Sequence, residues 1–277
     1  MKKFLLIAAI LLCTLIGAAF AAGIAEIPWN ESNIQTLRGF DENSVDALVN
    51  NLRGGDPMHA MVGGFGWYDL AGDHHYELVV TEDLSGRAWF EYLAIYRQDH
   101  AGKPAVQQWI EGDGIGTDLS KVVRDLNHDG KHELIIPRVL FSYSTSETFT
   151  WPAVYRLENG KFVEASRDFP TFYDKEVLPA LDKYISEAQA QTDARSRPQD
   201  VAAVITMKRD KILRVLGRDP TAGLREAYQW MNSDDRQVLQ CAIATFADIG
   251  GHDQEKRAAS EALERALARE KAARKGG

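Results

Sequence analysis

One loop limits the fold of this chain more than any other segment: residues 125–133, with the sequence Asp-Leu-Asn-His-Asp-Gly-Lys-His-Glu. Counted from its first residue, side chains that carry oxygen occupy positions one, three, five and nine. Calcium prefers six to eight hard oxygen ligands, which a coiled loop supplies from alternate residues. The glycine at position six allows the sharp turn that brings the next carbonyl toward the ion. The spacing therefore predicts calcium bound by Asp125, Asn127, Asp129, the backbone carbonyl of Lys131, and Glu133.

The segments beside this loop decide what kind of calcium loop it is. An EF-hand requires a bidentate glutamate at position twelve, where this chain has Ile136, and a helix on each side. Here residues 121–124 and 134–136 are short and rich in β-branched side chains, which predicts strands. A strand, an Asp-x-Asn-x-Asp-Gly-x-x-Glu loop and another strand resemble the FG-GAP or VCBS repeat, the blade unit of integrin-type β-propellers. The resemblance implies a calcium-binding loop and a role in adhesion or ligand recognition.

A second copy of the loop supports a repeat. Residues 69–80 align without gaps with residues 125–136, and residues 94–97 match residues 153–156. Two copies that lie at nearly the same separation along the chain indicate repeated supersecondary units. We call residues 69–77 the first loop and residues 125–133 the second loop. The first loop has Ala71 at position three and a histidine at position six, which leaves open whether it binds an ion or is only a structural turn.

The N-terminus predicts export. Two lysines precede an apolar run over residues 4–20, and residues 19–21 form an Ala-x-Ala cleavage pattern. We expect a cleaved signal peptide and a periplasmic or secreted protein with no membrane span after cleavage. The alternatives are a permanent anchor, which lacks a following stop-transfer cluster, and a lipoprotein at Cys13, where Leu12 stands in place of a small residue.

The charge and cysteine content of the mature chain exclude some classes of protein. Loss of Lys2 and Lys3 leaves 30 basic and 40 acidic residues, which disfavours nucleic-acid binding. Only Cys241 remains, so no internal disulfide forms. It lies in a helical apolar pattern, and we expect a buried, unreactive thiol.

The pattern of apolar residues predicts an α+β protein: an antiparallel β-domain of two propeller-blade-like repeats, followed by an α-helical C-terminal region. Eight strands are expected before Pro170, the last two joined by a turn at Asn159-Gly160. A short helix capped by Asp41 is expected to cover a sheet edge. The expected divisions are residues 1–21 (signal peptide), 22–57 (N-terminal segment with a short helix), 58–168 (FG-GAP/VCBS-like β-domain), 169–252 (helical region) and 253–277 (charged, Ala-rich helical tail).

Three features of the later chain carry further expectations. A helix is expected to begin at Asp219-Pro220. The last helix is expected to be weakly held, either as a solvated tail or as a helix that binds a partner. Residues 141–151 alternate aromatic and hydroxyl side chains, so the aromatics either pack the sheet core or form an exposed platform together with Trp89 or Trp109. The histidines of both loops have unsuitable spacing for a transition metal and are expected to be exposed.

Motifs for nucleophilic catalysis, zinc proteolysis and phosphate binding are absent from the sequence, and no catalytic residue is assigned. The sequence therefore favours an exported, non-enzymatic binding or adhesion module with a structural calcium loop and an unidentified protein or glycan ligand. One alternative is a secreted, calcium-stabilised hydrolase of cell-wall or extracellular polymer, because a glycosidase can place its two carboxylates far apart in sequence. The other is a regulatory partner of another exported protein.

Overall fold

A computed structural model describes residues 23–53, 61–83, 92–144, 147–190 and 198–275. The expected signal peptide and Trp89 lie outside the described residues. The chain divides into two compact units. We call Met1–Arg138 with Pro152–Ala165 the β unit, and Val139–Trp151 with Ser166–Gly277 the helical unit.

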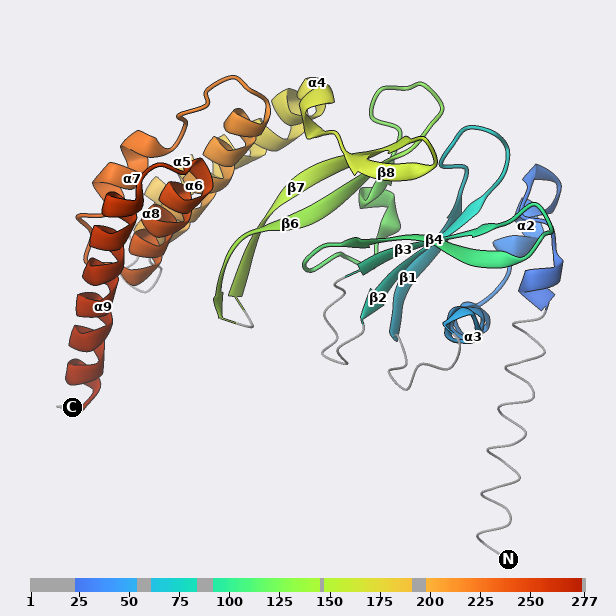
Figure 1. Ribbon diagram of the computed structural model, residues 1–277, viewed down its shortest axis with the longest axis horizontal. Helices are drawn as coiled ribbons and strands as arrows, with labels where there is room; N and C mark the ends of the chain where they lie inside the picture. Colours follow the sequence, from blue (N-terminus) through green and yellow to red (C-terminus); the bar gives the residue numbers. More distant parts are fainter. Residues whose placement is uncertain (1–22, 54–60, 84–91, 145–146, 191–197, 276–277) are drawn as a thin grey trace, which may run out of the picture. The chain divides into compact units, whose positions relative to one another are not determined.

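The first sheet is antiparallel and has its strands in chain order (Figure 1). They are β1 (Met61–Tyr68), β2 (Glu77–Asp83), β3 (Tyr92–Gln98) and β4 (Pro104–Glu111). Aromatic and β-branched residues make up three of the seven residues in each of β2 and β3, and they suit the pleated backbone. The first loop connects β1 to β2.

The second sheet repeats this order with β5 (Val123–Arg124), β6 (Glu133–Ser144), β7 (Glu147–Glu158) and β8 (Lys161–Glu164). The second loop connects β5 to β6, in the place that the first loop has in its own sheet. The expected turn joins β7 to β8, with φ values of 50° at Asn159 and 78° at Gly160. Left-handed values at both residues are those of a hairpin turn that matches strand twist. The expected antiparallel strands of an α+β protein are thus confirmed.

Both faces of the first sheet are covered, and every residue of β2 is buried. Alternate residues of a strand point to opposite faces, so β2 contributes to two separate cores. On one face Val79 packs in a core that also contains Leu134 and Ile136 of the second sheet. On the other face Leu78 and Val80 pack against the N-terminal helices.

The N-terminal segment contains η1 (Glu31–Asn33), α2 (Ile34–Leu37) and α3 (Glu42–Leu52). The expected cap of α3 is confirmed, because the Asp41 side chain accepts a hydrogen bond from the Ser44 amide at 2.9 Å. The expectation that α3 covers a sheet edge is wrong. Its apolar stripe, which includes Val45 and Leu48, packs in the same core as Leu78 of the central strand β2, because only a sheet face offers enough apolar surface to bury the stripe.

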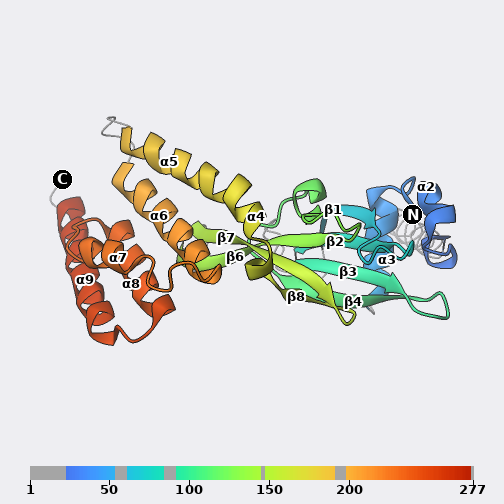
Figure 2. The same cartoon turned by 90° about the horizontal axis from the view of Figure 1, so that it is seen from above.

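The helical unit continues from the β8 end of the chain with η3 (Ser166–Asp168), α4 (Pro170–Phe172), a π-helical turn η4 (Tyr173–Val177), α5 (Leu178–Ala190), α6 (Pro198–Val215), α7 (Leu224–Trp230), α8 (Arg236–Ile249) and α9 (Asp253–Lys275). Helices α5 and α6 lie side by side, and α8 contacts α6, α7 and α9 (Figure 2). Cys241 is fully buried in α8, as expected, and burial raises the pKa of its thiol to about 12.

Helix α7 begins later than the sequence predicts. The Asp219 side chain accepts a hydrogen bond from the Thr221 amide at 3.0 Å and so closes a turn before the helix. Gly223 then adopts a left-handed conformation, with φ of 93°, immediately before Leu224. Asp219 therefore caps this turn and not the helix, because an Asp side chain can accept a hydrogen bond either at a helix start or within a local turn.

The expectation of a weakly held last helix is also wrong, because α9 packs against α8. Ala259 is fully buried in a core with Phe246 of α8, and Ala266 is buried as well. Arg269 pairs with Asp234 at 2.6 Å. Small side chains let two helices approach closely, so alanines form the buried stripe that a search for large apolar residues misses.

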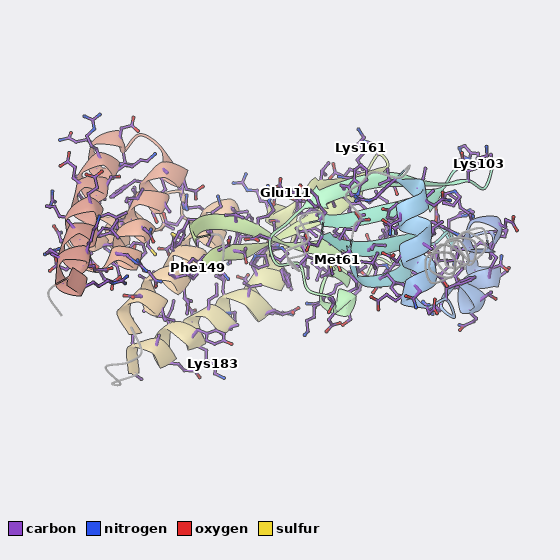
Figure 3. The ribbon with its side chains drawn as sticks, turned by 90° about the horizontal axis from the view of Figure 1, so that it is seen from below. Met61, Lys103, Glu111, Phe149, Lys161 and Lys183 are labelled. Atoms are coloured by element: carbon purple, nitrogen blue, oxygen red, sulfur yellow. The ribbon has the colours of Figure 1, made fainter. Side chains whose placement is uncertain are left out.

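Phe141 in β6 and Phe149 and Trp151 in β7 lie in the parts of these strands that belong to the helical unit. Phe149 lies on the hairpin (Figure 3), and Phe141 stacks on it with ring centroids 4.9 Å apart. Both rings pack in a core with Met207 and Cys241. For these two rings the expectation of packing in the sheet core is wrong. Strands β5 and β8 have two and four residues and cannot flank twelve-residue strands along their length, so helices cover the remainder.

Candidate metal centre

The two loops follow the same backbone path. At position four Gly72 and His128 have φ values of 69° and 62°, and at position six His74 and Gly130 have values of 62° and 83°. Residues other than glycine rarely adopt positive φ, although His does so more often than most. The exchange of glycine and histidine between the loops therefore leaves the turn intact, and His74 does not exclude the conformation of the second loop.

The side-chain oxygens of the second loop are held by its own backbone amides. Asp125 accepts from the amides of Asp129 and Gly130, at 3.2 and 3.1 Å. Asn127 accepts from the Asp129 amide at 3.1 Å, and Asp129 accepts from the Lys131 amide at 2.9 Å. Three of the five predicted ligand residues, Asp125, Asn127 and Asp129, thus accept amides in one hydrogen-bond network, which orients their side-chain oxygens.

The first loop repeats this network position by position. Asp69 accepts from the amides of Asp73 and His74, at 3.0 and 2.9 Å. Asp73 accepts from the His75 amide at 3.0 Å. Ala71 has no oxygen to add at position three. The first loop therefore keeps the carboxylates of positions one and five and lacks only the amide side chain between them.

In each loop the glutamate at position nine accepts a hydrogen bond from the backbone amide at position two. Glu77 accepts from the Leu70 amide at 3.1 Å, and Glu133 accepts from the Leu126 amide at 2.9 Å. Both glutamates are 1% exposed. Burial raises the pKa of Glu77 to about 7, and burial followed by the nearby acidic side chains raises the pKa of Glu133. Each loop therefore carries a negative charge that is costly to keep without a nearby cation.

An arginine meets two carboxylates of the first loop. In the first loop Arg97 of β3 donates from Nη2 to Asp73 Oδ2 at 2.8 Å, and its Nε lies 3.4 Å from Glu77 Oε1. The matching residue of the second repeat, Arg156, forms an ion pair with Glu158. The sequence alone did not identify Arg97, because the pairing of β2 with β3 brings it beside the first loop.

The loops also pack against each other within the β unit. The His132 amide donates to the Leu70 carbonyl at 3.3 Å, and His132 Nδ1 lies 2.9 Å from the Asp69 carbonyl oxygen. A carbonyl only accepts, so this nitrogen carries the proton. A Cβ added to Gly72 would lie 3.1 Å from the Gly130 carbonyl oxygen. His132 is thus partly buried between the loops, and the expectation of exposed histidines holds only for the other three.

The N-terminal segment contacts the first loop through position eight of that loop, the same position through which the second loop contacts the first. Tyr76, which matches His132, donates its amide to the Trp29 carbonyl at 2.9 Å and its hydroxyl to Glu31 at 2.5 Å. Next to this contact lies a cavity of about 740 Å³. Its lining comes from the N-terminal segment, the first loop and the β3–β4 turn: Pro28, Trp29, Asn30, Asp73, His75, Tyr76, Arg97, Gln98, Asp99, His100 and Gly102.

The predicted ligand atoms of the second loop are of the chemical type that calcium prefers. Its oxygens are hard, and a carboxylate oxygen that accepts one amide keeps a further lone pair for an ion. Within the described parts of the chain, no three His, Cys, Asp or Glu side chains converge closely enough to form a metal site. The second loop thus presents oriented ligands, without a closed coordination shell, and calcium binding there stays a prediction.

Comparisons of the chain with protein-family models, with curated proteins and with solved structures give no match. None of the helices in the described ranges is long and apolar enough to span a membrane.

Proposed function

We propose that this chain is an exported, non-enzymatic binding or adhesion module, whose two sheets are blade-like repeats of the FG-GAP/VCBS kind and whose second loop holds a structural calcium ion. The ligands would be Asp125, Asn127, Asp129, the Lys131 carbonyl and Glu133. Bound calcium supplies positive charge at the connection between β5 and β6. The ligand of the module is a protein or a glycan.

The hydrogen-bond network of the second loop is the observation that carries this proposal. Backbone amides of the loop orient the side chains of Asp125, Asn127 and Asp129, and the buried Glu133 accepts the Leu126 amide. The matching first loop has the same network with a guanidinium at its carboxylates. A cation at these positions therefore satisfies the charge of the loop, and in the second loop a divalent ion supplies it.

The cavity beside the first loop supports a binding role. Its volume of about 740 Å³ lies in the range of small-molecule sites. Its walls are fixed by hydrogen bonds: Gln98 accepts from the Trp29 amide at 2.8 Å and donates to the Ile27 carbonyl at 2.8 Å. A preformed cavity of this size, with both polar and apolar walls, suits part of a glycan or a peptide side chain.

The test of the proposed function is thermal unfolding of the mature chain with and without millimolar calcium. An ion that binds only the folded state stabilises it, by about 2.7 kcal/mol at a hundredfold excess over Kd. We expect the melting temperature of the wild type to rise with calcium and that of Asp129→Ala to stay unchanged.

Matched controls separate a specific site from general screening of acidic charge. Asp113→Ala removes an acidic residue outside both loops and should keep the calcium response. Magnesium, which demands a tighter octahedral shell, should stabilise the wild type less than calcium. Equal responses of wild type and Asp129→Ala to calcium would contradict the proposal.

A further inference from the structure

We infer that the cavity beside the first loop is a binding site for an uncharged, hydroxyl-rich sugar unit of a glycan. The inference rests on the proposed function, in which the module binds a protein or a glycan, and it adds the place and the chemical class of the ligand. No residue of the second loop lines the cavity, so the site does not require the calcium ion proposed there.

The first argument is that the cavity is shaped before any ligand arrives. The Gln98 side chain accepts the Trp29 amide at 2.8 Å. It also donates to the carbonyls of Ala25 and Ile27, at 3.2 and 2.8 Å. Trp29 Nε1 donates to the Ile24 carbonyl at 3.1 Å. These groups have partners within the protein, so they fix the walls and leave the choice of ligand to other side chains.

The second argument concerns the polar groups that remain free at the cavity. The rings of His75 and His100 line it and have no hydrogen-bond partner within the described ranges. The Asn30 carbonyl oxygen accepts from Asn33 at 3.2 Å, which leaves the N–H groups of its side chain. Asp99 accepts the amides of the β3–β4 turn through Oδ1, which leaves Oδ2. A neutral imidazole adds one donor and one acceptor, so the cavity offers groups of both kinds.

The third argument is the charge of the lining, which favours an uncharged ligand. It includes one cation, Arg97, and two anions, Asp73 and Asp99. The guanidinium is already occupied, because it donates to Asp73 at 2.8 Å and lies 3.4 Å from Glu77. An acidic sugar would therefore meet surplus negative charge, and like charges at an interface oppose binding.

A basic ligand fits the free groups no better. An ammonium or guanidinium has donors only, and it would leave the Asn30 amide group without an acceptor. A hydroxyl group both donates and accepts. Several hydroxyls on one ring can therefore satisfy imidazole, amide and carboxylate groups together.

The fourth argument separates a sugar from a peptide. The Tyr76 ring lines the cavity and provides apolar surface for the C–H groups of a sugar. An extended peptide gains affinity by pairing with free backbone at a strand edge. Beside this cavity the backbone is already paired, by the Asn30–His75 bridge and by the 2.9 Å bond from the Asp99 amide to the Lys103 carbonyl in the β3–β4 turn (Figure 3). This paired backbone is unavailable to an added strand.

The test is binding of the full mature chain to an array that contains neutral, sialylated and sulfated glycans together with peptides. The neutral set includes hexoses, N-acetylhexosamines, pentoses and deoxyhexoses. We expect neutral glycans to bind and acidic glycans and peptides to bind more weakly. Isothermal titration with the neutral oligosaccharide that binds best then compares the variants.

Two substitutions remove free groups of the cavity without breaking a bond of the fold. His75→Ala and His100→Ala should each weaken glycan binding about two- to tenfold, the effect of one lost hydrogen bond. The double variant should weaken it further. Gln35→Ala, the matched control, changes an exposed residue of the N-terminal segment outside the lining and should bind like the wild type. Circular dichroism and the melting temperature confirm that each variant is folded.

Three outcomes overturn the inference. The first is a wild-type chain that binds no neutral glycan of the array. The second is stronger binding of an acidic glycan or a peptide. The third is equal affinity of wild type and the double histidine variant, which would place the sugar elsewhere on the chain.

Asp129→Ala separates this inference from the calcium proposal. The variant should bind the neutral glycan within about twofold of the wild type, because distant sites act independently. Glycan binding without any response to calcium would support the inference and contradict the calcium site. A calcium response without glycan binding would support the calcium site and overturn the inference.

Discussion

The β unit and the helical unit differ in the way they accommodate buried carboxylates. In the β unit Glu77 and Glu133 each accept a backbone amide from a loop, and Glu82 accepts from the Tyr96 hydroxyl at 2.5 Å. In the helical unit Asp210 Oδ2 is buried and has no hydrogen-bond partner among the described residues. Its nearest cation is Arg209, 3.6 Å from the other carboxylate oxygen.

The difference follows from where backbone amides are available. A helix uses its amides for its own i to i−4 bonds, so a carboxylate in the middle of a helix finds none free. A loop that reverses the chain leaves several amides unpaired, and these turn toward a carboxylate. A buried acid beside a loop is therefore stabilised by the backbone amides of that loop, whereas a buried acid on a helix depends on side chains for its partners.

The largest expected effect concerns a buried carboxylate of the β unit that is paired with an arginine. Arg53 forms an ion pair with Glu82, whose pKa is raised by burial, and both side chains are at least nine-tenths buried. Arg53→Met should cost about 3–5 kcal/mol in urea unfolding near neutral pH, because it leaves a buried charge without its partner. The double variant with Glu82→Gln should lose less than Arg53→Met alone. A loss of under about 1 kcal/mol for Arg53→Met would show that the pair contributes little.

The second prediction concerns Asp210, the buried carboxylate of the helical unit whose Oδ2 has no hydrogen-bond partner among the described residues. Burial, with Glu226 as the next cause, raises the pKa of Asp210 to about 7 from an ordinary 3.8. The unfolded chain releases the proton first, so this group makes stability fall as pH rises from about 4 to about 7, with no further change above. Asp210→Asn should remove up to about 4 kcal/mol of this loss.

The measurement is the free energy of unfolding at pH 5 and pH 8 for wild type and Asp210→Asn. The variant should gain more stability relative to wild type at pH 8 than at pH 5, because the loss is complete only above about pH 7. A matched variant, Asp182→Asn, changes an exposed acid on α5 that pairs with Arg209 and should show no such gain. An equal effect of Asp210→Asn at both pH values would exclude a protonated Asp210 in the folded state.

The third prediction concerns the packing of α9. Ala259→Leu should cost about 1–3 kcal/mol, because added methylenes overpack a fully buried position beside α8. Ala258→Leu, at the neighbouring exposed position, should lie within about 0.5 kcal/mol of wild type. Chemical unfolding followed by circular dichroism compares them. Equal stabilities would mean that α9 is solvated, as the sequence alone suggests.

The smallest expected effect is local to α3 in the β unit. Asp41→Ala removes the hydrogen bond to the Ser44 amide and should cost about 1 kcal/mol. Asn51→Ala changes an exposed residue near the other end of the same helix and should change stability by less than about 0.5 kcal/mol. A difference below the error of thermal unfolding would show that solvent replaces the cap.

Much of the fold could be read from local patterns. Short apolar runs marked the strands, and the turn at Asn159-Gly160 and the cap at Asp41 lie where their side-chain chemistry requires. The spacing of oxygen side chains also identified the second loop as the candidate site. Its predicted ligand residues are neighbours in sequence, so their proximity needs no knowledge of the tertiary fold.

Interactions between distant residues were not predictable in the same way. Arg97 reaches Asp73 only because β2 pairs with β3 in one register, and His132 reaches Asp69 only because the loops pack together. A single sequence does not state that register. The burial of Ala259 was missed for a related reason, since an alanine is small enough for either a buried or an exposed position.

The sequence by itself determined the elements, the two acidic loops and the residues predicted to bind calcium, because periodicity, turn chemistry and ligand spacing act over a few neighbouring residues. Only the tertiary structure decided that Arg97 meets the first loop, and that helices pack against Phe141, Phe149 and Ala259. Those choices depend on contacts between residues far apart in the chain, whose energies are set by packing and burial.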